Sequence, residues 1–284
     1  MIDEQKLLAY PFPEIRTQIR WQDVAQYNLS IGLGQDPLDL RQLPFTYEPN
    51  LRAMPSMAVV LGYPGFWVKE PGTGVDWVKV VHGEQSLILH KPLPASGEIV
   101  GMTVVTGIVD RGPGKGAMIY SERVVRDAAT GEKLATLEQT TFARGDGGFG
   151  GQPGPVKAPH PEAIGTPDIT LDLPTRPEQA AYYRLNGDHN PLHIDPGVAQ
   201  AAGFKAPILH GLCTFGVVCH ALMRELCDYD PAKFGRMDLR FSSPVYPGET
   251  IRTEIWREAG GASFRARVVE RDVVVVSNGL FSFA

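Results

Sequence analysis

The sequence has few cysteines and no long apolar run, and both shortages limit the class of protein. Its 284 residues include three cysteines, Cys213, Cys219 and Cys227, without Cys-x-x-Cys spacing. An odd number of clustered cysteines, in a sequence without a signal peptide, indicates free thiols on one core helix in a reducing compartment. No segment approaches the ~18 consecutive apolar residues of a membrane-spanning helix, and no Ser-Lys-Leu ends the chain. We therefore expect a cytoplasmic protein that binds no membrane.

The sequence also lacks a basic cluster, a metal-binding motif and a nucleophile motif. The formal net charge is -5, which disfavours nucleic acid as a partner. No set of His, Cys and Asp has the spacing of metal ligands, so no metal is predicted. The absence of Gly-x-Ser-x-Gly, and of a base beside any cysteine, disfavours nucleophilic catalysis.

What the sequence does contain is one order of elements that occurs twice. A strand leads to a Pro-rich corner that ends in Gly-Glu, and three more strands follow. The repeat indicates an internal duplication. The predicted strands are 79–93, 99–110, 117–126 and 133–144 in the first half, and 237–241, 251–258, 264–270 and 273–283 in the second.

Helices are predicted before each set of strands. The segments 21–27 and 177–183 both read as short helices, and 54–61 and 210–226 as apolar helices. The last is apolar on nearly all sides, as a buried helix is. A long buried helix wrapped by a curved antiparallel sheet is the hot-dog arrangement. The predicted fold class is therefore α+β, a double hot-dog of two curved antiparallel sheets, each wrapped on a central helix.

The two halves are joined by a segment rich in Gly and Pro. We place the first half at 1–150, a linker at 151–166 and the second half at 167–284. The stretch Gly145-Asp-Gly-Gly-Phe-Gly150 matches the dinucleotide fingerprint G-x-G-x-x-G. That fingerprint requires a helix directly after it, and the Gly-Gln-Pro-Gly-Pro that follows here does not start one, so we interpret the stretch as a flexible crossing.

The most informative stretch is Asn186-Gly-Asp-His-Asn-Pro-Leu-His193. Gly187 can end the preceding helix in a left-handed conformation, and Asp188, Asn190 and His193 then share a short loop stiffened by Pro191. An Asp and a His on such a loop can converge on one water molecule for acid–base chemistry. The alternative is local, an Asx turn at Asp188 and an ordinary Asn-Pro turn.

A second feature lies where the long buried helix begins. Pro207-Ile-Leu-His-Gly211 leads directly into that helix, whose first N–H groups are free and lie at the positive end of the helix dipole. A thioester oxygen at the Gly211 N–H would be polarised as an enolate develops. Simple helix initiation is the alternative for Gly211.

Asp-x-Asn-Pro-Leu-His followed by Ile-Leu-His-Gly-Leu-Cys-Thr-Phe-Gly closely resembles the hydratase 2 family. These are MaoC-like, (R)-specific 2-enoyl-CoA hydratases, and they include the hydratase portion of peroxisomal multifunctional enzyme type 2. The resemblance extends to His82-Gly-Glu-Gln85, Lys91-Pro-Leu-Pro94 and Pro244-Val-Tyr-Pro-Gly248, and so covers nearly the whole chain.

The resemblance implies reversible hydration of trans-2-enoyl-CoA to (R)-3-hydroxyacyl-CoA without a cofactor, as in fatty-acid β-oxidation. It makes Asp188 and His193 the catalytic pair, with Asn190 orienting the water or the pair and the Gly211 N–H as oxyanion donor. The acyl-CoA partner is then contacted by seven residues: His82, Gly83, Arg111, His189, Pro191, Leu192 and Phe241. A homodimer is a further expectation.

There are departures from the family pattern. Ser243 and Ala95 stand where some relatives have a basic residue, which opens the question of which cations hold the CoA phosphates. Four candidates remain: Lys91, Arg111, Lys115 and Lys205. Three functional alternatives also stay open: a MaoC-like dehydratase for a polyketide, sterol or acyl-carrier-protein thioester, a thioesterase, and a non-catalytic acyl-CoA-binding subunit.

The first half lacks the catalytic loop, with Gln35-Asp-Pro37 in the corresponding region, so one active site per chain is expected. Its helix region contains Pro49 and Pro55, which predicts a short or broken helix. Such a helix would leave apolar volume beside the sheet, with Met54 and Met57 adapting to it. We therefore expect a medium or long acyl tail to enter the first half.

Overall fold

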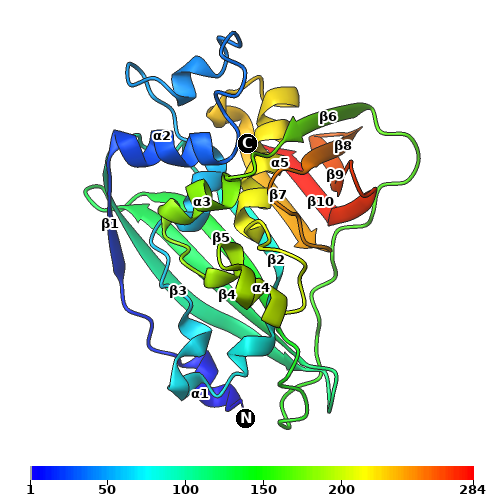
Figure 1. Ribbon diagram of the computed structural model, residues 1–284. Helices are drawn as coiled ribbons and strands as arrows, with labels where there is room; N and C mark the ends of the chain where they lie inside the picture. The colour runs from blue at the N-terminus through cyan, green and yellow to red at the C-terminus, as the bar shows by residue number, and fades with distance from the viewer. Residues whose placement is uncertain (1) are drawn as a thin grey trace.

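The structure, a computed structural model, describes residues 2–284 and is organised by one ten-stranded antiparallel sheet. Its strand order is β1-β3-β4-β5-β2-β7-β10-β9-β8-β6 (Figure 1). The strands are β1 Ile15–Ile19, β2 Val80–Leu89, β3 Gly97–Asp110, β4 Ala117–Asp127, β5 Lys133–Ala143, β6 Ile169–Pro174, β7 Phe234–Phe241, β8 Thr250–Glu258, β9 Gly261–Val268 and β10 Val273–Phe283.

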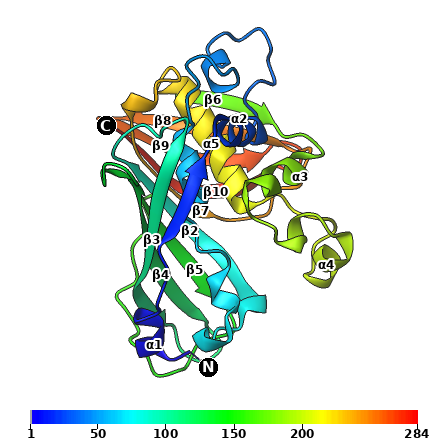
Figure 2. The ribbon, with the colours of Figure 1, turned by 90° about the vertical axis from the view of Figure 1, so that its left-hand side faces the viewer.

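The helices are short except for one. The α-helices are α1 Glu4–Leu8, α2 Trp21–Ser30, α3 Gln179–Tyr183, α4 Pro196–Ala201 and α5 Gly211–Glu225. The 3-10 helices are η1 Leu43–Phe45, η2 Pro55–Val60, η3 Trp67–Lys69, η4 Pro71–Thr73, η5 Trp77–Lys79, η6 Arg184–Asn186, η7 Pro191–His193 and η8 Pro231–Lys233. Helices α2, α3 and α5 lie on one side of the sheet, and the segment that joins the halves runs along the other (Figure 2).

The strand order repeats the duplication seen in the sequence. Strands β1 to β5 form one half of the sheet and β6 to β10 the other, with the same internal order read from the two outer edges. The eight predicted strands are confirmed. Strands β1 and β6 were not predicted, because each has six residues or fewer and lies at a sheet edge with a half-exposed burial pattern.

The central helix differs between the halves. In the second half α5 has 15 residues and packs against β6, β7 and β8, as predicted. In the first half the corresponding segment is only the 3-10 helix η2. The prediction of a central helix in each half is therefore correct for the second half only, and the prediction of a short or broken helix in the first half is confirmed. Pro55 at the start of η2 and the buried, tightly packed Gly62 after it keep this segment short.

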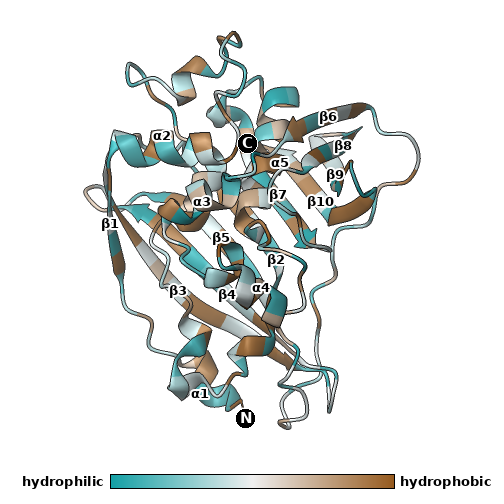
Figure 3. Cartoon of the chain, viewed as in Figure 1, coloured by the Kyte–Doolittle hydropathy of each residue, from teal (hydrophilic) through white to brown (hydrophobic). Residues whose placement is uncertain are grey.

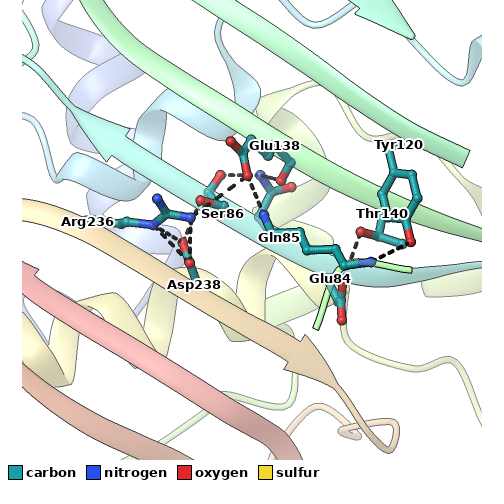
Figure 4. Close-up of polar contacts among 9 residues, drawn as sticks. Glu84, Gln85, Ser86, Tyr120, Glu138, Thr140, Arg236 and Asp238 are labelled. Carbon is teal, nitrogen blue, oxygen red and sulfur yellow. Dashed lines mark hydrogen bonds and ion pairs between the residues drawn. The ribbon is translucent and has the colours of Figure 1, made fainter. Parts of the chain in front are cut away.

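The halves meet where β2 pairs with β7. The register runs from Glu84 opposite Arg240 to Ile88 opposite Arg236. On the face away from the helices, Arg240 forms an ion pair with Glu84 at 2.7 Å. On the same face Ser86 donates to Asp238 at 2.5 Å (Figure 4). Backbone pairing and these polar contacts make the two predicted sheets one continuous sheet.

One large hydrophobic core fills the space between the helices and the sheet. It includes Tyr27 of α2, Met54 and Met57 beside η2, and Phe215 of α5. Apolar residues accordingly colour much of α5 and the strands near it brown (Figure 3). The three cysteines are free and buried, as predicted, but only Cys213 and Cys219 lie on α5, because the helix ends at Glu225, before Cys227. Within residues 2–284, no helix combines the length and the apolar character that crossing a bilayer requires.

The glycine-rich stretch before the linker binds a carboxylate of the protein itself. The N–H groups of Gly148, Gly150 and Gly151 donate to Asp110 at 2.7, 2.9 and 3.3 Å, and that of Gly112 at 2.8 Å. These bonds hold the pKa of the Asp110 carboxyl below its usual range. No helix follows the stretch, so the rejection of the dinucleotide fingerprint is confirmed.

Candidate active site

The loop that carries Asp188 and His193 is shaped by local chemistry. Helix α3 continues into η6, and Gly187 ends it with φ at +108°, a conformation that favours glycine. Pro191 then starts η7, and the Asn190 side chain accepts the Leu192 N–H at 3.1 Å. The backbone N–H of Asn190 in turn donates to the Asp188 carboxylate at 3.2 Å. The predicted turn and the predicted convergence of functional groups therefore coexist.

His193 is held in one tautomer. Its Nδ1 lies 2.8 Å from the Ile208 carbonyl oxygen, and because a carbonyl can only accept, Nδ1 carries the proton. The neutral ring then has its lone pair on Nε2. Burial lowers the pKa of His193 below its usual value, while the bond to Ile208 and the charge of Asp188 act in the opposite direction. At neutral pH the ring is a base, with Nε2 ready to accept a proton.

His210 supports both members of the pair. Its ring stacks on His193 with the centroids 3.8 Å apart and the planes 29° apart. Its Nε2 donates to the backbone carbonyl of Asp188 at 3.3 Å. His210 is only 1% exposed, and burial lowers its pKa to about 4, so the ring is neutral. No motif in the sequence assigned a role to His210, yet the structure makes it a contact of both Asp188 and His193.

The three side chains form one cluster. Ligand-type atoms of Asp188, His193 and His210 all lie within 4.8 Å of one another. Asp188 is half-buried and His193 is 8% exposed, so the cluster faces solvent on the side of the carboxylate. A water molecule bound there would contact both a carboxylate oxygen and the Nε2 of His193.

These atoms do not form a good metal site. An imidazole binds a metal along its lone pair, in the plane of the ring. Because the rings of His193 and His210 are stacked and nearly parallel, their planes do not converge at bonding distance from both rings. The cluster therefore fits acid–base chemistry better than metal coordination.

Gly211 begins α5 directly beside the cluster. It is the first residue of a 15-residue helix, so its N–H has no partner within the helix. The Phe241 ring flanks it, 3.5 Å from the position that a Cβ on Gly211 would take. Phe241 also packs edge-on against His82, with the ring centroids 4.9 Å apart. The predicted oxyanion donor and two predicted substrate contacts thus lie together.

The first half contributes His82 through a bulge. The register between β2 and β5 shifts between His82 and Glu84, so that His82 faces the same side as Gln85. A Cβ on Gly83 would lie 3.2 Å from the Thr140 carbonyl oxygen, a contact that favours glycine here. Burial lowers the pKa of His82 to about 4, and the charge of Asp188 acts against that shift. His82 therefore lies near Asp188, across the junction of the halves.

Tyr63 is a neighbour of the site that sequence reasoning missed. Burial and then the charge of Asp188 raise its pKa to about 12, so the phenol stays protonated beside the carboxylate. Tyr63 follows η2 in the first half, 125 positions before Asp188. Because only the pairing of the two halves brings these residues together, no local motif marks Tyr63.

Other predicted residues lie elsewhere or face solvent. His189 and Pro191 are exposed on the loop, and Leu192 is half-exposed. Arg111 is exposed in the β3–β4 turn, where its N–H bonds to Gly116, and no hydrogen bond in residues 2–284 links it to the Asp188 loop. Among the candidate cations, Lys91 pairs with Glu132, whereas Lys205 lies 4.5 Å above the centre of the Tyr246 ring.

A cavity of about 630 Å³ lies on the other face of the sheet, between the strands and residues 154–160 of the linker. Its charged side chains include the Glu84–Arg240 pair and Glu138, which pairs with Lys157. Figure 4 shows Glu84 and Glu138 on this face. None of the predicted catalytic residues lines it, so size alone does not identify the active site.

Comparison with known proteins gives two family matches. A model of the MaoC-like domain matches residues 160–279, and a model of the MFE-2 hydratase 2 N-terminal domain matches residues 18–145. Together they cover both halves of the sheet.

Individual relatives have names that agree with these two family matches. The chain is 37% identical over 287 residues to enoyl-CoA hydratase ChsH3 of Mycobacterium tuberculosis, covering 98% of each protein. It is 38% identical over 260 residues to mouse peroxisomal multifunctional enzyme type 2, covering 88% of this chain but only 34% of that larger protein. The crystal structure of a MaoC-like dehydratase from Phytophthora capsici superposes with a TM-score of 0.88 at 34% identity, covering 100% of this chain and 98% of that one.

Proposed function

The chain belongs to the MaoC-like hydratase 2 family and is an enoyl-CoA hydratase, and we propose that it adds water to trans-2-enoyl-CoA through Asp188 and His193 to give (R)-3-hydroxyacyl-CoA. The observation that supports this assignment most is the fixed tautomer of His193 beside the Asp188 carboxylate, which leaves a free base at Nε2.

The first step is activation of water. A water molecule held by the Asp188 carboxylate and His193 Nε2 gives up a proton to the pair while its oxygen attacks C3 of the substrate. The π electrons of the C2–C3 bond move toward C2 and the thioester carbonyl. His210 keeps the pair in place through its stack on His193 and its bond to Asp188.

The second step is proton return. The developing negative charge on the thioester oxygen is stabilised by the Gly211 N–H at the start of α5, where the helix dipole is favourable. The proton taken from water then passes from the pair to C2, so one water is consumed and none of the protein groups is changed. Water and the thioester are the only reactants, and we propose that no cofactor takes part.

The CoA portion requires cations near the opening of the site. Lys205 lies over the Tyr246 ring, and the Arg271 guanidinium lies 5.3 Å from the centre of the same ring. Val245, next to Tyr246, accepts the N–H of Leu209, just before His210 and Gly211. We assign Lys205 the phosphate-binding role in preference to Lys91, which is already paired with Glu132.

We also propose that the chain divides into a first half at 1–150, a linker at 151–166 and a second half at 167–284. The protein is proposed to be a cytoplasmic homodimer. The main alternative, a MaoC-like dehydratase for an acyl-carrier-protein, polyketide or sterol thioester, would use the same residues in the reverse direction.

The test is turnover and stereochemistry with defined thioesters. Crotonyl-CoA and crotonyl-acyl carrier protein are compared by loss of enoyl absorbance, and the product is analysed with dehydrogenases specific for (R)- or (S)-3-hydroxyacyl-CoA. We expect turnover of the CoA thioester and oxidation only by the (R)-specific enzyme. Formation of the (S) product, or turnover of the carrier-protein thioester alone, would contradict the proposal.

A further inference from the structure

A buried guanidinium lies on the inner face of the first half, where the acyl group would extend. Arg123 belongs to β4 and is only 8% exposed. Its Nη2 donates to the Val59 carbonyl at 2.6 Å, but its buried Nε has no hydrogen-bond partner among residues 2–284. No carboxylate in residues 2–284 offsets its charge, and burial lowers the pKa of Arg123 to about 10. An arginine is rarely buried without an anion or acceptor to bind.

Arg123 is part of a small polar cavity. The cavity has a volume of about 20 Å³, and its polar lining is contributed by Tyr63, Gln85, Thr103, Ser121, Arg123 and Gln139. Thr103 is 7% exposed, and its hydroxyl also lacks a partner in the described part of the chain. Two side chains that each carry a buried, unpartnered polar atom therefore line one space that is large enough for a single oxygen atom.

The cavity borders the catalytic cluster. Tyr63 lines it, with the Arg123 guanidinium 5.2 Å from the ring centre, and Tyr63 is also close enough to Asp188 to feel its charge. Gln85 lines it as well, and its side chain contacts His82. A chain that starts at the reacting carbons beside Asp188 and passes Tyr63 would reach Arg123.

These polar groups change the expectation for the acyl tail. The sequence predicted open apolar volume beside η2, but Met54 and Met57 are buried within the packed core, and the cavity described here is small and only partly apolar. An apolar tail at this place would leave the Arg123 Nε and the Thr103 hydroxyl unpaired, which costs binding energy.

We infer that the acyl group of the natural substrate carries an acceptor oxygen, a carboxylate in particular, that binds Arg123 and Thr103. This inference rests on the proposed hydratase function and specifies its substrate class. A carboxylate is the best complement because the guanidinium has no counter-ion among the described residues, and a charge-assisted hydrogen bond discriminates by about tenfold to a hundredfold.

The experiment measures kcat/KM for matched thioesters. The substrates are unsubstituted, ω-hydroxy and ω-carboxy trans-2-enoyl-CoA of six, eight and ten carbons, and the readout is the ratio of substituted to unsubstituted kcat/KM at each length. We expect a ratio of about ten or more for the carboxylate at one length. It should fall to about one in Arg123→Met, fall about threefold or more in Thr103→Val, and stay partly raised in Arg123→Lys.

Arg126→Met is the matched control, because Arg126 lies on the same strand, is exposed and also donates to a backbone carbonyl, that of Gly131 at 3.0 Å. It should keep the wild-type ratio. Because a ratio cancels any loss of folded protein, and Thr103→Val does not touch the Val59 contact, a folding defect does not imitate the result.

The failures are distinguishable. A wild-type ratio near one for both substituents at all lengths would mean that the cavity holds a water molecule only, and would overturn the inference while the hydratase function stands. An unchanged ratio in both Arg123→Met and Thr103→Val would also overturn it. Turnover of none of the thioesters would instead contradict the proposed function, and the inference with it.

Discussion

Replacing His210 should slow the reaction without contacting the substrate, since His210 acts through its neighbours. It is 1% exposed, stacks on His193 at 3.8 Å and donates to the Asp188 carbonyl at 3.3 Å. The hydrogen bond contributes about 1 kcal/mol and the ring stack about 1 kcal/mol. If both terms hold the pair in its reactive geometry, loss of about 2 kcal/mol lowers kcat by about 30-fold.

Two variants separate the terms. His210→Phe keeps a stacked ring and loses the hydrogen bond, so kcat should fall about fivefold, whereas His210→Ala loses both and should reach about 30-fold. The assay is hydration of crotonyl-CoA as a function of pH, with KM and kcat resolved. His90→Ala is the control, because His90 is exposed and its side chain contacts Thr136 at 2.9 Å, away from Asp188 and His193. Wild-type kcat in both His210 variants, or a change confined to KM, would refute the positioning role.

Three further predictions test other parts of the site. Gly211→Pro removes one N–H at a helix position that tolerates proline, so kcat should fall about 100-fold with a small change in Tm; an unchanged kcat would remove Gly211 from the oxyanion site. Asn190→Asp keeps the oxygen that caps η7 and removes the amide, so near-normal kcat would assign Asn190 to the cap alone, and a loss equal to that of Asn190→Ala would show that the amide acts on the water. His210 and His220 are each 1% exposed with pKa lowered to about 4 by burial, from 6.5. The unfolded chain binds their protons near pH 6.5 and the folded chain only near pH 4, so stability is complete above pH 6.5 and falls by about 3 kcal/mol per ring as the pH drops toward 4. Urea midpoints that stay flat across that range would contradict this, and His220→Gln should make the slope shallower.

Local signals in the sequence predicted what local forces determine. Alternating β-branched residues marked the eight longer strands, and the apolar surface of residues 210–226 marked α5. The turn residues Gly187 and Pro191 fixed the loop that carries Asp188 and His193. Strands β1 and β6 escaped prediction because their few residues pair only at the sheet edges.

Contacts between the halves were not predictable in the same way. The charge of Asp188 acts on Tyr63, and His82 packs on Phe241, only because β2 pairs with β7. The resemblance to the hydratase 2 family suggested His82 and Phe241 but not Tyr63 or Arg123. The polar interior beside Arg123 was not predicted, because polar residues such as Thr103, Ser121 and Arg123 are common on strands. Only the curved sheet brings these three side chains to one cavity.

The central claim is that Asp188 and His193 act as one acid–base unit on water. The most direct test is the rate of crotonyl-CoA hydration by Asp188→Asn, His193→Gln and the double variant, with far-UV circular dichroism to confirm the fold. Each single variant should lower kcat by about 10² to 10⁴, and the double variant should be little worse than the slower single one, because the two groups share one water. A single variant with near wild-type kcat, or losses that multiply fully in the double variant, would contradict the account.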